Sequence, residues 1–404
     1  MKRLLALIIA LVMVAALAAC GDEEKKEEAK SEAPAPVVQA EIMIGVLSDL
    51  SGPTSAVGQP YAEGIKACAE YLNENGGING KQIKLLQVDY AYNVQQALAA
   101  YKRFKSEGMV ALQGWGTADT EALTQFVSND KMPTWSASYS AHLTDPAKAP
   151  YNFFVAADYT TQMRAGLKYL KENWTETRAP KLAFIYPDHP YGLSPIAGGK
   201  EYAAEIGFEI VGEENVDLKA MDATTQLLAL QKKAPDFCWI GGTTPSTSVV
   251  LKDAKKLSMK TTFLINIWGN DESLIDLAGD ASEGQLGLQA AAVYNDDVPG
   301  AALIRERTGG QPVMSHYLRG FASTLVMAEA IKIADAAGKL NGEGIKDAAE
   351  SLRDFDPMGL TPAVSYFADD HRPNMSVNIY KVEAGQLVKI ASPTLERKAE
   401  WLGH

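Results

Sequence analysis

A segment rich in glycine, aromatic and hydroxyl residues stands at the start of a helical pattern. Residues 111–126 read ALQGWGTADTEALTQF, an apolar run followed by Gly-Trp-Gly and two threonines. The first N–H groups of a helix have no partner inside the helix, so this end can hold a carboxylate or another acceptor. We predict that the segment grips a small molecule through Trp115, Gly116, Thr117 and Thr120. The alternative is that Thr117 only caps its own helix, with Asp119 and Glu121 facing the helix dipole.

The glycines of this chain do not form a nucleotide-binding motif. GWGTAD, residues 114–119, has the first two glycines of a dinucleotide fingerprint, but Asp119 stands where the third would be and would repel a pyrophosphate. GGINGK, residues 76–81, lacks both the spacing of a P-loop and the hydroxyl after the lysine. The sequence therefore predicts no nucleotide cofactor.

Catalytic and metal-binding patterns are absent from the sequence as well. The five histidines are scattered without the paired spacing of metal ligands. Ser194, in YGLSPIAGG, lacks the glycine two positions later that a nucleophile elbow requires. We predict no metal, no cofactor and no catalytic residue, so the chain is not expected to be an enzyme.

Two further polar segments follow apolar runs. Residues 134–144, TWSASYSAHLT, supply Ser136, Ser138 and Tyr139, and residues 186–194, YPDHPYGLS, supply Tyr191. Each segment follows an expected strand, where a ligand would be bound. The alternatives are a plain polar loop in the first case and a turn tyrosine packed on the next helix in the second.

Short β-rich runs alternate with amphipathic helical patterns from residue 41 onward. Near-continuous apolar strands separated by such helices indicate buried parallel sheets built from βαβ units, with ligands beyond the carboxyl ends of the strands. The units form two sets, one before and one after about residue 156, and this much chain favours two α/β lobes. The expected strands are 42–47, 83–89, 109–114, 181–187, 208–216, 237–242 and 261–268.

The first forty residues have the pattern of an export signal followed by a linker. Lys2 and Arg3 precede an apolar run, so residues 1–19 are predicted to be a signal peptide. LAAC, ending at Cys20, resembles the lipobox of bacterial lipoproteins, which implies lipidation of Cys20. Residues 20–40 are charged and then rich in proline and alanine, as in a flexible tether. The alternatives are an incidental cysteine in an ordinary signal peptide and an uncleaved anchor.

Charge and cysteine content restrict the partners further. The net charge is −12; the first 20 residues contribute +2 and the next 20 contribute −3, which leaves −11 for residues 41–404. Such a balance disfavours nucleic acid and anionic membrane surfaces as partners. Cys68 and Cys238 lie in a helical and a strand-like pattern far apart in the sequence, and we expect two buried free thiols rather than a disulfide.

Several motifs together are similar to one family. Residues 42–93, with SGP, then GGINGK, then an acidic residue after a strand, closely resemble the opening of periplasmic substrate-binding proteins of the branched-chain amino acid type. HPYGLS, PDFCWIGG and SLIDLAGDASEGQLG extend the resemblance over most of residues 41–395. The resemblance implies a type I periplasmic binding fold, with two doubly wound parallel-sheet lobes joined by a hinge of three crossovers.

The resemblance also implies where the protein works and with what. We expect a monomer on the periplasmic side of the cell envelope, held to a membrane by the lipid anchor. It would capture a small-molecule ligand by lobe closure and deliver it to an ABC permease in the inner membrane. Lobe 1 would comprise 41–156 plus 290–360, and lobe 2 would comprise 157–289 plus 361–404.

Site residues carried over from the family include both matches and departures. Thr117 and, as a further candidate, Thr120 match hydroxyls that hold a ligand carboxylate, and Tyr191 matches an aromatic side chain of the second lobe. Ser138 and Tyr139 match a pair that offers a backbone carbonyl and a hydroxyl. Where amino-acid binders place an acid for the ligand ammonium, this chain has Ile267 and Trp268, and Val57 replaces an aromatic residue. Asp158 or Tyr159 falls near another ammonium-binding position, with the register open by one residue.

These departures change the expected ligand. An ammonium buried without a carboxylate costs several kcal/mol, so we do not expect leucine, isoleucine or valine. Trp115, Tyr139, Tyr191 and Trp268 predict an aromatic-walled pocket for an amino acid-like solute, an aromatic or aliphatic acid, or an amide. The alternative function is a ligand-sensing lipoprotein of the same fold that signals to a membrane partner.

Overall fold

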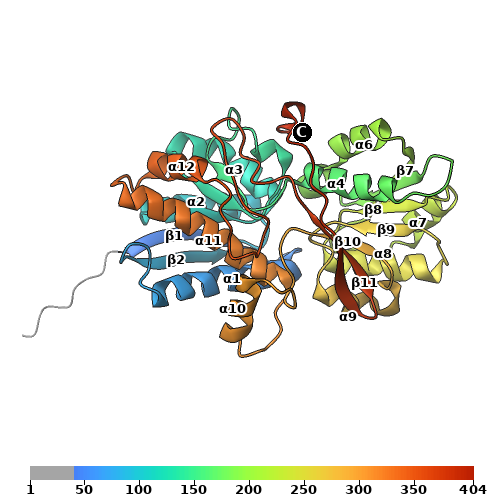
Figure 1. Ribbon diagram of the computed structural model, residues 1–404, viewed down its shortest axis with the longest axis horizontal. Helices are drawn as coiled ribbons and strands as arrows, with labels where there is room; N and C mark the ends of the chain where they lie inside the picture. The colour runs from blue at the N-terminus through green and yellow to red at the C-terminus, as the bar shows by residue number, and fades with distance from the viewer. Residues whose placement is uncertain (1–40) are drawn as a thin grey trace, which may run out of the picture. The chain divides into compact units, whose positions relative to one another are not determined.

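A computed structural model describes residues 41–404 (Figure 1). The predicted signal peptide (1–19), the lipidated Cys20 and the tether (20–40) lie outside the described residues. Within 41–404, no helix combines the length and the hydrophobicity that crossing a bilayer requires.

A parallel five-stranded sheet is built from the first part of the described chain, in the order β2-β1-β3-β4-β5. Its strands are β1 (Glu41–Ser48), β2 (Gln82–Asp89), β3 (Ala111–Gly114), β4 (Thr134–Ser136) and β5 (Asn152–Phe153). Helices α1 (Ser55–Glu74), α2 (Val94–Ser106) and α3 (Thr117–Asp130) connect its first four strands. The three strands expected before residue 120 are confirmed: β1 and β3 are largely buried, whereas β2 lies at the edge of the sheet and is partly exposed.

A seven-stranded sheet follows, in the order β12-β11-β10-β9-β8-β6-β7. Its parallel strands are β6 (Lys181–Tyr186), β7 (Glu209–Asn215), β8 (Phe237–Ile240), β9 (Thr262–Ile265) and β10 (Leu286–Gln289). The antiparallel hairpin of β11 (Asn378–Glu383) and β12 (Gln386–Ala391) completes one edge. The helices between β5 and β10 are α4 (Tyr159–Glu172), α5 (Pro190–Leu193), α6 (Ile196–Glu205), α7 (Thr224–Gln231), α8 (Thr244–Lys256) and α9 (Glu272–Ala278).

Three more helices separate β10 from β11: α10 (Pro299–Arg307), α11 (Ser315–Ala336) and α12 (Gly342–Ser351). Helix α11 packs against α1, beside the five-stranded sheet (Figure 1). The chain therefore passes between the two groups of elements three times: after β5, after β10 and after α12. Three crossovers between two mainly parallel sheets confirm the predicted fold class.

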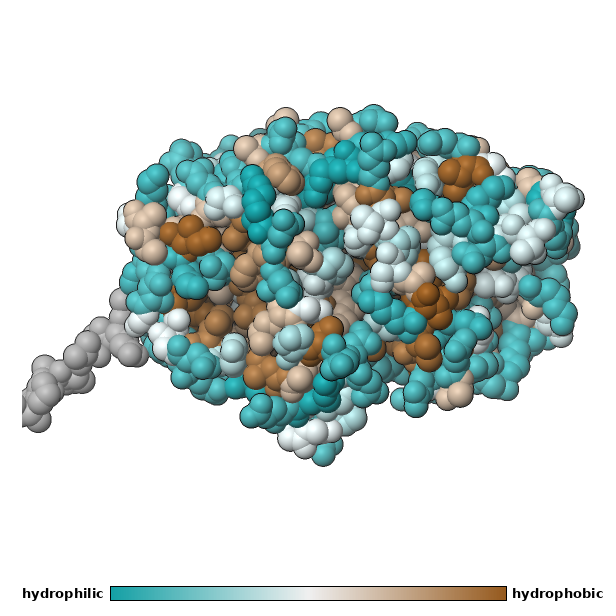
Figure 2. Space-filling view, viewed as in Figure 1, coloured by the Kyte–Doolittle hydropathy of each residue, from teal (hydrophilic) through white to brown (hydrophobic). Residues whose placement is uncertain are grey.

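The surface and the thiols agree with a well-buried core. The face shown in Figure 2 is mostly hydrophilic, with separate hydrophobic areas rather than one continuous band. Cys68 in α1 and Cys238 in β8 are both buried and free, as predicted, and burial raises the pKa of each thiol. Neither thiol is suited to react at neutral pH.

Helices α1 and α11 approach each other through glycine. A Cβ atom at Gly64 would collide with the carbonyl oxygen of Tyr317, and one at Gly320 would collide with that of Tyr61. The two backbones therefore touch at a point where neither helix can carry a larger residue. Because α11 follows the crossover after β10, this contact fixes the start of α11 relative to α1.

We predict that Gly64→Ala destabilises the protein by about 1–3 kcal/mol or more, because the added methyl group meets backbone atoms that cannot turn away. Urea unfolding of the full chain measures this change. The matched control is Glu63→Ala, one residue away on the exposed side of α1, which is expected to stay within about 0.5 kcal/mol of the parent. Equal stability of Gly64→Ala and the parent would contradict the close approach.

Candidate ligand-binding site

The carboxyl ends of strands from both sheets lead into the walls of one pocket. Loops and helix starts after β1, β2, β3 and β4 supply one side, and those after β6, β8 and β9 supply the other. The free space between these walls, counting the part that is open to solvent, is about 270 Å³. Its lining residues are Thr54, Val57, Tyr92, Trp115, Thr117, Ala137, Tyr159, Tyr191, Thr243 and Trp268.

Four residues of the predicted site line this pocket: Trp115, Thr117, Tyr191 and Trp268. They come from segments up to 153 residues apart in the sequence, from 115 to 268. Thr117 is the first residue of α3, whose cap position is Gly116. Thr117 therefore stands inside the helix and not at its cap position, and its hydroxyl accepts a hydrogen bond from Ser138 Oγ at 2.9 Å.

The other predicted site residues are buried next to the lining and support it. Thr120 Oγ1 donates a hydrogen bond to the Gly116 carbonyl at 2.6 Å, within the first turn of α3. Ser138 Oγ donates to Thr117 Oγ1 at 2.9 Å, and Ser136 Oγ donates to the Ser138 carbonyl at 2.8 Å. These bonds orient Thr117 from behind.

Asp158 and Tyr139 take up structural positions beside the pocket. Both carboxylate oxygens of Asp158 accept hydrogen bonds from Thr161, one from its N–H at 2.8 Å and one from its hydroxyl at 2.6 Å, so that Asp158 caps α4. Tyr139 is buried and stacks on Trp268 with ring centroids 6.1 Å apart. The family resemblance left Asp158 and Tyr159 as alternatives for one ammonium-binding position. Of these two residues, Tyr159 lines the pocket.

The pocket also has lining residues that the sequence did not single out. Thr54 follows the expected strand 42–47, Ala137 lies in the predicted polar segment 134–144, and Thr243 follows β8 in the run GGTTPS, so position alone was a usable signal for them. Tyr92 is different, because it lies in a left-handed backbone conformation with φ of 58°. Few residues other than glycine adopt that conformation, and no sequence pattern indicates it for a tyrosine.

Aromatic side chains from the two sides contact one another across the pocket. Trp115 and Trp268 meet edge to face with centroids 5.1 Å apart. Tyr61 of α1 lies 5.3 Å from Trp115, and Tyr159 lies 5.6 Å from Tyr191. Such pairs favour these tilted geometries and add to the stability that burial provides.

Most polar atoms of the lining are already hydrogen bonded. The Tyr191 hydroxyl donates to the Gly242 carbonyl (3.1 Å) or to Asn266 Oδ1 (2.9 Å). Trp268 Nε1 donates to the Tyr159 hydroxyl at 2.9 Å. The Thr243 hydroxyl is buried and has no partner among residues 41–404, which leaves it free for a ligand.

No lining residue carries a charge, and the nearest acids are engaged elsewhere. Asp49 accepts hydrogen bonds from the Thr54 N–H and hydroxyl at 2.8 and 2.6 Å. Asp119 accepts from the Tyr90 hydroxyl at 2.8 Å and from the Gly116 N–H at 3.2 Å. Burial raises the pKa of Asp119 to about 7, although these hydrogen bonds act in the opposite direction.

We predict that Asp119→Asn removes a pH dependence of stability. The pKa of Asp119 is 3.8 before folding and about 7 in the native state. Between these values the native state binds more protons than the unfolded state, so stability falls as pH rises. Since asparagine resembles the protonated acid, the variant should gain stability relative to the parent from about pH 4 to about pH 7. Thermal unfolding across this range measures the effect.

The control for this prediction is Asp130→Asn at the other end of α3. Although burial opposes the shift, hydrogen bonds from Lys105 and Tyr101 lower the pKa of Asp130. The Asp130 carboxyl therefore titrates below this pH range. The difference in stability between Asp130→Asn and the parent should stay constant across the range. The same flat profile for Asp119→Asn would contradict a protonated Asp119.

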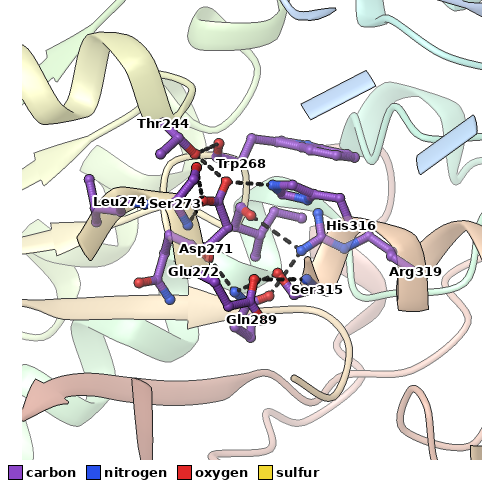
Figure 3. Close-up of polar contacts among 12 residues, drawn as sticks. Thr244, Trp268, Asp271, Glu272, Ser273, Leu274, Gln289, Ser315, His316 and Arg319 are labelled. Carbon is purple, nitrogen blue, oxygen red and sulfur yellow. Dashed lines mark hydrogen bonds and ion pairs between the residues drawn. The ribbon is translucent and has the colours of Figure 1, made fainter. Parts of the chain in front are cut away.

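A buried polar network adjoins Trp268 (Figure 3). Asp271 caps α9 through the N–H groups of Ser273 and Leu274 and contacts His316 Nε2 at 2.8 Å. His316 stacks on Trp268 with ring centroids 5.2 Å apart. The guanidinium of Arg319 lies over the same indole, 4.5 Å from the ring centroid. Helix α11 therefore holds this wall of the pocket in place.

The pKa values of Asp271 and His316 are both shifted by their surroundings. Burial lowers the pKa of His316, although Asp271 acts in the opposite direction. Burial would raise the pKa of Asp271, but hydrogen bonds from His316, Ser273 and Thr244 together outweigh burial, and the pKa is lowered. The pair is thus a neutral imidazole beside a carboxylate at neutral pH. Within residues 41–404, no group of three His, Cys, Asp or Glu residues is placed to hold a metal ion.

Two mainly parallel α/β sheets with a pocket between their strand ends define a two-lobed binding protein. Comparison with known proteins agrees with this class. The model of the periplasmic binding protein family matches residues 41–386. The chain therefore belongs to the periplasmic binding protein family, whose members are binding proteins and not enzymes, as the sequence predicts.

Solved structures and curated sequences give the same result. A substrate-binding protein of an ABC transporter from Aeropyrum pernix is 31% identical, with a TM-score of 0.84 over 90% of this chain and 98% of that one. A branched-chain amino acid ABC transporter protein from Thermus thermophilus, solved with bound valine, is 24% identical with a TM-score of 0.82, over 89% and 97% of the two chains. At that identity the likeness shows the fold.

Curated sequences match at 22–24% identity. The Leu/Ile/Val-binding protein homolog 2 of Brucella abortus (strain 2308) is 24% identical over 249 residues, which is 61% of this chain and 66% of that relative. The match spans just under two thirds of the length of that relative. A binding protein for leucine, isoleucine, valine, threonine and alanine from Pseudomonas aeruginosa is 22% identical over 77% of this chain and 82% of its own length.

Proposed function

We propose that this protein captures a small apolar or aromatic solute that lacks an α-ammonium group, and delivers it to an ABC permease in the inner membrane. The solute is a carboxylic acid or an amide of modest size. Membership of the periplasmic binding protein family supports capture and delivery. The LAAC motif at Cys20 supports attachment to a membrane through a lipid, on the periplasmic side of the cell envelope.

The observation that carries this proposal is the uncharged, aromatic lining of the pocket. An ammonium group bound there would find no carboxylate among the lining residues. Asp158 is the acid that falls near an ammonium-binding position of the family, and both of its carboxylate oxygens accept hydrogen bonds from Thr161. An unpaired buried charge costs several kcal/mol, so an amino acid is a poor ligand for this pocket.

Closure of two lobes is the proposed way of enclosing the solute. The lining comes from both predicted lobes: Trp115 and Thr117 belong to 41–156, whereas Tyr191 and Trp268 belong to 157–289. A solute between them touches both at once and favours the arrangement in which they are close. The permease then recognises this closed arrangement.

We predict that acids and amides with an apolar body stabilise the full chain, whereas leucine and valine do not. A ligand at one hundred times its Kd adds about 2.7 kcal/mol to the free energy of unfolding. Thermal unfolding with phenylacetate, phenylacetamide, 3-methylbutanoate and 3-methylbutanamide, beside L-leucine and L-valine, makes the comparison. Stabilisation by the two amino acids alone would refute the proposal.

We also predict that Trp115→Ala weakens binding of phenylacetate or phenylacetamide on the order of 10-fold or more, because a large wall of the pocket is lost. Isothermal titration measures the Kd. The matched control is Trp174→Ala, which removes an indole packed on Phe237 at 5.6 Å and absent from the pocket lining. That control should lower stability and leave the Kd unchanged. Equal Kd values for Trp115→Ala and the parent would exclude this pocket as the site.

A further inference from the structure

One residue of the pocket lining reaches the surface of the protein. Of the ten lining residues, nine are buried, whereas Tyr92 is partly exposed. The Tyr92 ring lies directly on Gly116 at the start of α3, where a Cβ atom on residue 116 would collide with the edge of the ring. Tyr92 therefore stands where the pocket meets the solvent.

The ring of Tyr92 also contacts the opposite side of the pocket. Tyr92 lies between β2 and α2 of the five-stranded sheet, and its ring stacks on His189 with centroids 5.3 Å apart and an angle of 28° between the planes. His189 follows β6 of the seven-stranded sheet and caps α5 by accepting a hydrogen bond from the Tyr191 N–H at 3.3 Å. The stack thus joins the two sides of the pocket next to Tyr191, another lining residue.

A second contact joins the two sides at the other end of α5. Ser194, the residue that ends this short helix, donates a hydrogen bond from its hydroxyl to Ser140 Oγ at 3.1 Å. Ser140 follows β4 of the five-stranded sheet, and its own hydroxyl donates to Glu121 Oε1 of α3 at 2.9 Å. Helix α5 is therefore attached to the first side at both of its ends, and both attachments must break when the two sides separate.

The loop that carries Tyr92 has an unfavourable backbone conformation. The Asn93 N–H donates to the Tyr90 carbonyl at 2.9 Å, and the two residues between them, Ala91 and Tyr92, have φ of 50° and 58°. Turns with positive φ at both central positions are usually made of glycine, asparagine or aspartate. Strain of this kind persists only where surrounding contacts hold it, and it is concentrated at ligand clamps and switches. Asp89 Oδ1 supplies one such contact by accepting from the Ala91 N–H at 3.0 Å.

We propose that Tyr92 is the gate of the pocket: its stack on His189 holds the closed arrangement, and the solute enters and leaves when this stack opens. The inference rests on the lobe closure of the proposed function and adds the residue that regulates it. An aromatic pair of this kind changes an equilibrium on the order of 10-fold. Loss of the stack therefore favours the open arrangement by about that factor.

The first test measures closure without any solute. Spin labels are attached to Gln125→Cys on α3 and Ala204→Cys on α6, two exposed positions on different groups of elements (Figure 1). Cys68 and Cys238 are buried and stay unlabelled, and Cys20→Ala removes the remaining thiol of the full chain. Electron spin resonance then gives the distances between the labels and the ratio of open to closed molecules.

Two variants remove the stack from either side. Tyr92→Ala removes one ring, and His189→Asn removes the other while keeping a side chain that can cap α5. We expect each to raise the ratio of open to closed molecules on the order of 10-fold. The double variant should do no more than either alone, because both residues act through one contact. Tyr92→Phe keeps the ring and should match the parent.

The second test measures the rate of release. Stopped-flow tryptophan fluorescence follows the dissociation of phenylacetate and phenylacetamide, and Tyr92→Ala should raise the rate constant on the order of 10-fold. The matched control is Tyr71→Ala, which removes a partly buried tyrosine of α1 that packs on Phe321 at 5.9 Å and is absent from the lining. That control should lower stability and leave both the rate constant and the label distances unchanged, as would a purely structural Tyr92.

The outcomes separate the gate from the proposed function. If Tyr92→Ala alters neither the label distances nor the release rate, the gate is wrong while closure stands. A single set of distances that neither solute nor variant changes would rule out closure, and the gate with it. Binding of leucine alone would overturn the proposed class of solute, and the label distances would still decide whether Tyr92 is the gate.

Discussion

The packing of Trp268 is the interaction on which the rest of the site depends. Its ring touches Trp115 and Tyr61 from the side of the five-stranded sheet, and His316 and Arg319 from α11. The residue itself follows β9 of the seven-stranded sheet. One indole therefore joins the pocket, the polar network and both sheets. A large rigid ring suits this position, because it buries much surface while losing little conformational freedom.

Burial explains why the surroundings of Trp268 are so fully determined. Asp271, His316 and Arg319 have no exposed surface, and each must find partners or a compensating charge inside the protein. Asp271 does so through α9 and His316, which ties the start of α9 to the start of α11. The close approach of α1 and α11 at Gly64 then fixes α11 against the other side. Polar satisfaction and backbone contact thus cooperate to place one wall of the pocket.

The fold could be predicted from the sequence to a greater extent than the site. Strands such as 42–47 and 181–187 are apolar runs whose burial the periodicity indicates directly, and each coincides with an observed strand. Trp115 and Tyr191 could be placed because they follow such strands. Tyr92 could not, since its left-handed backbone depends on its loop. Arg319 could not either: it lies 51 residues beyond Trp268 in sequence, from 268 to 319, and only the crossover brings it beneath the indole.

The hairpin of β11 and β12 has a consequence for how the chain reaches this structure. β10 pairs with β11, although 88 residues separate the end of β10 at Gln289 from the start of β11 at Asn378. The seven-stranded sheet is therefore incomplete until nearly the whole chain is present, and before then β10 offers an unpaired edge. Contacts this distant in sequence make folding slow, and open edges invite association between chains. A chain that must leave the cytoplasm before it folds would gain from this order of events, because its native sheet forms only after the C-terminal strands have arrived.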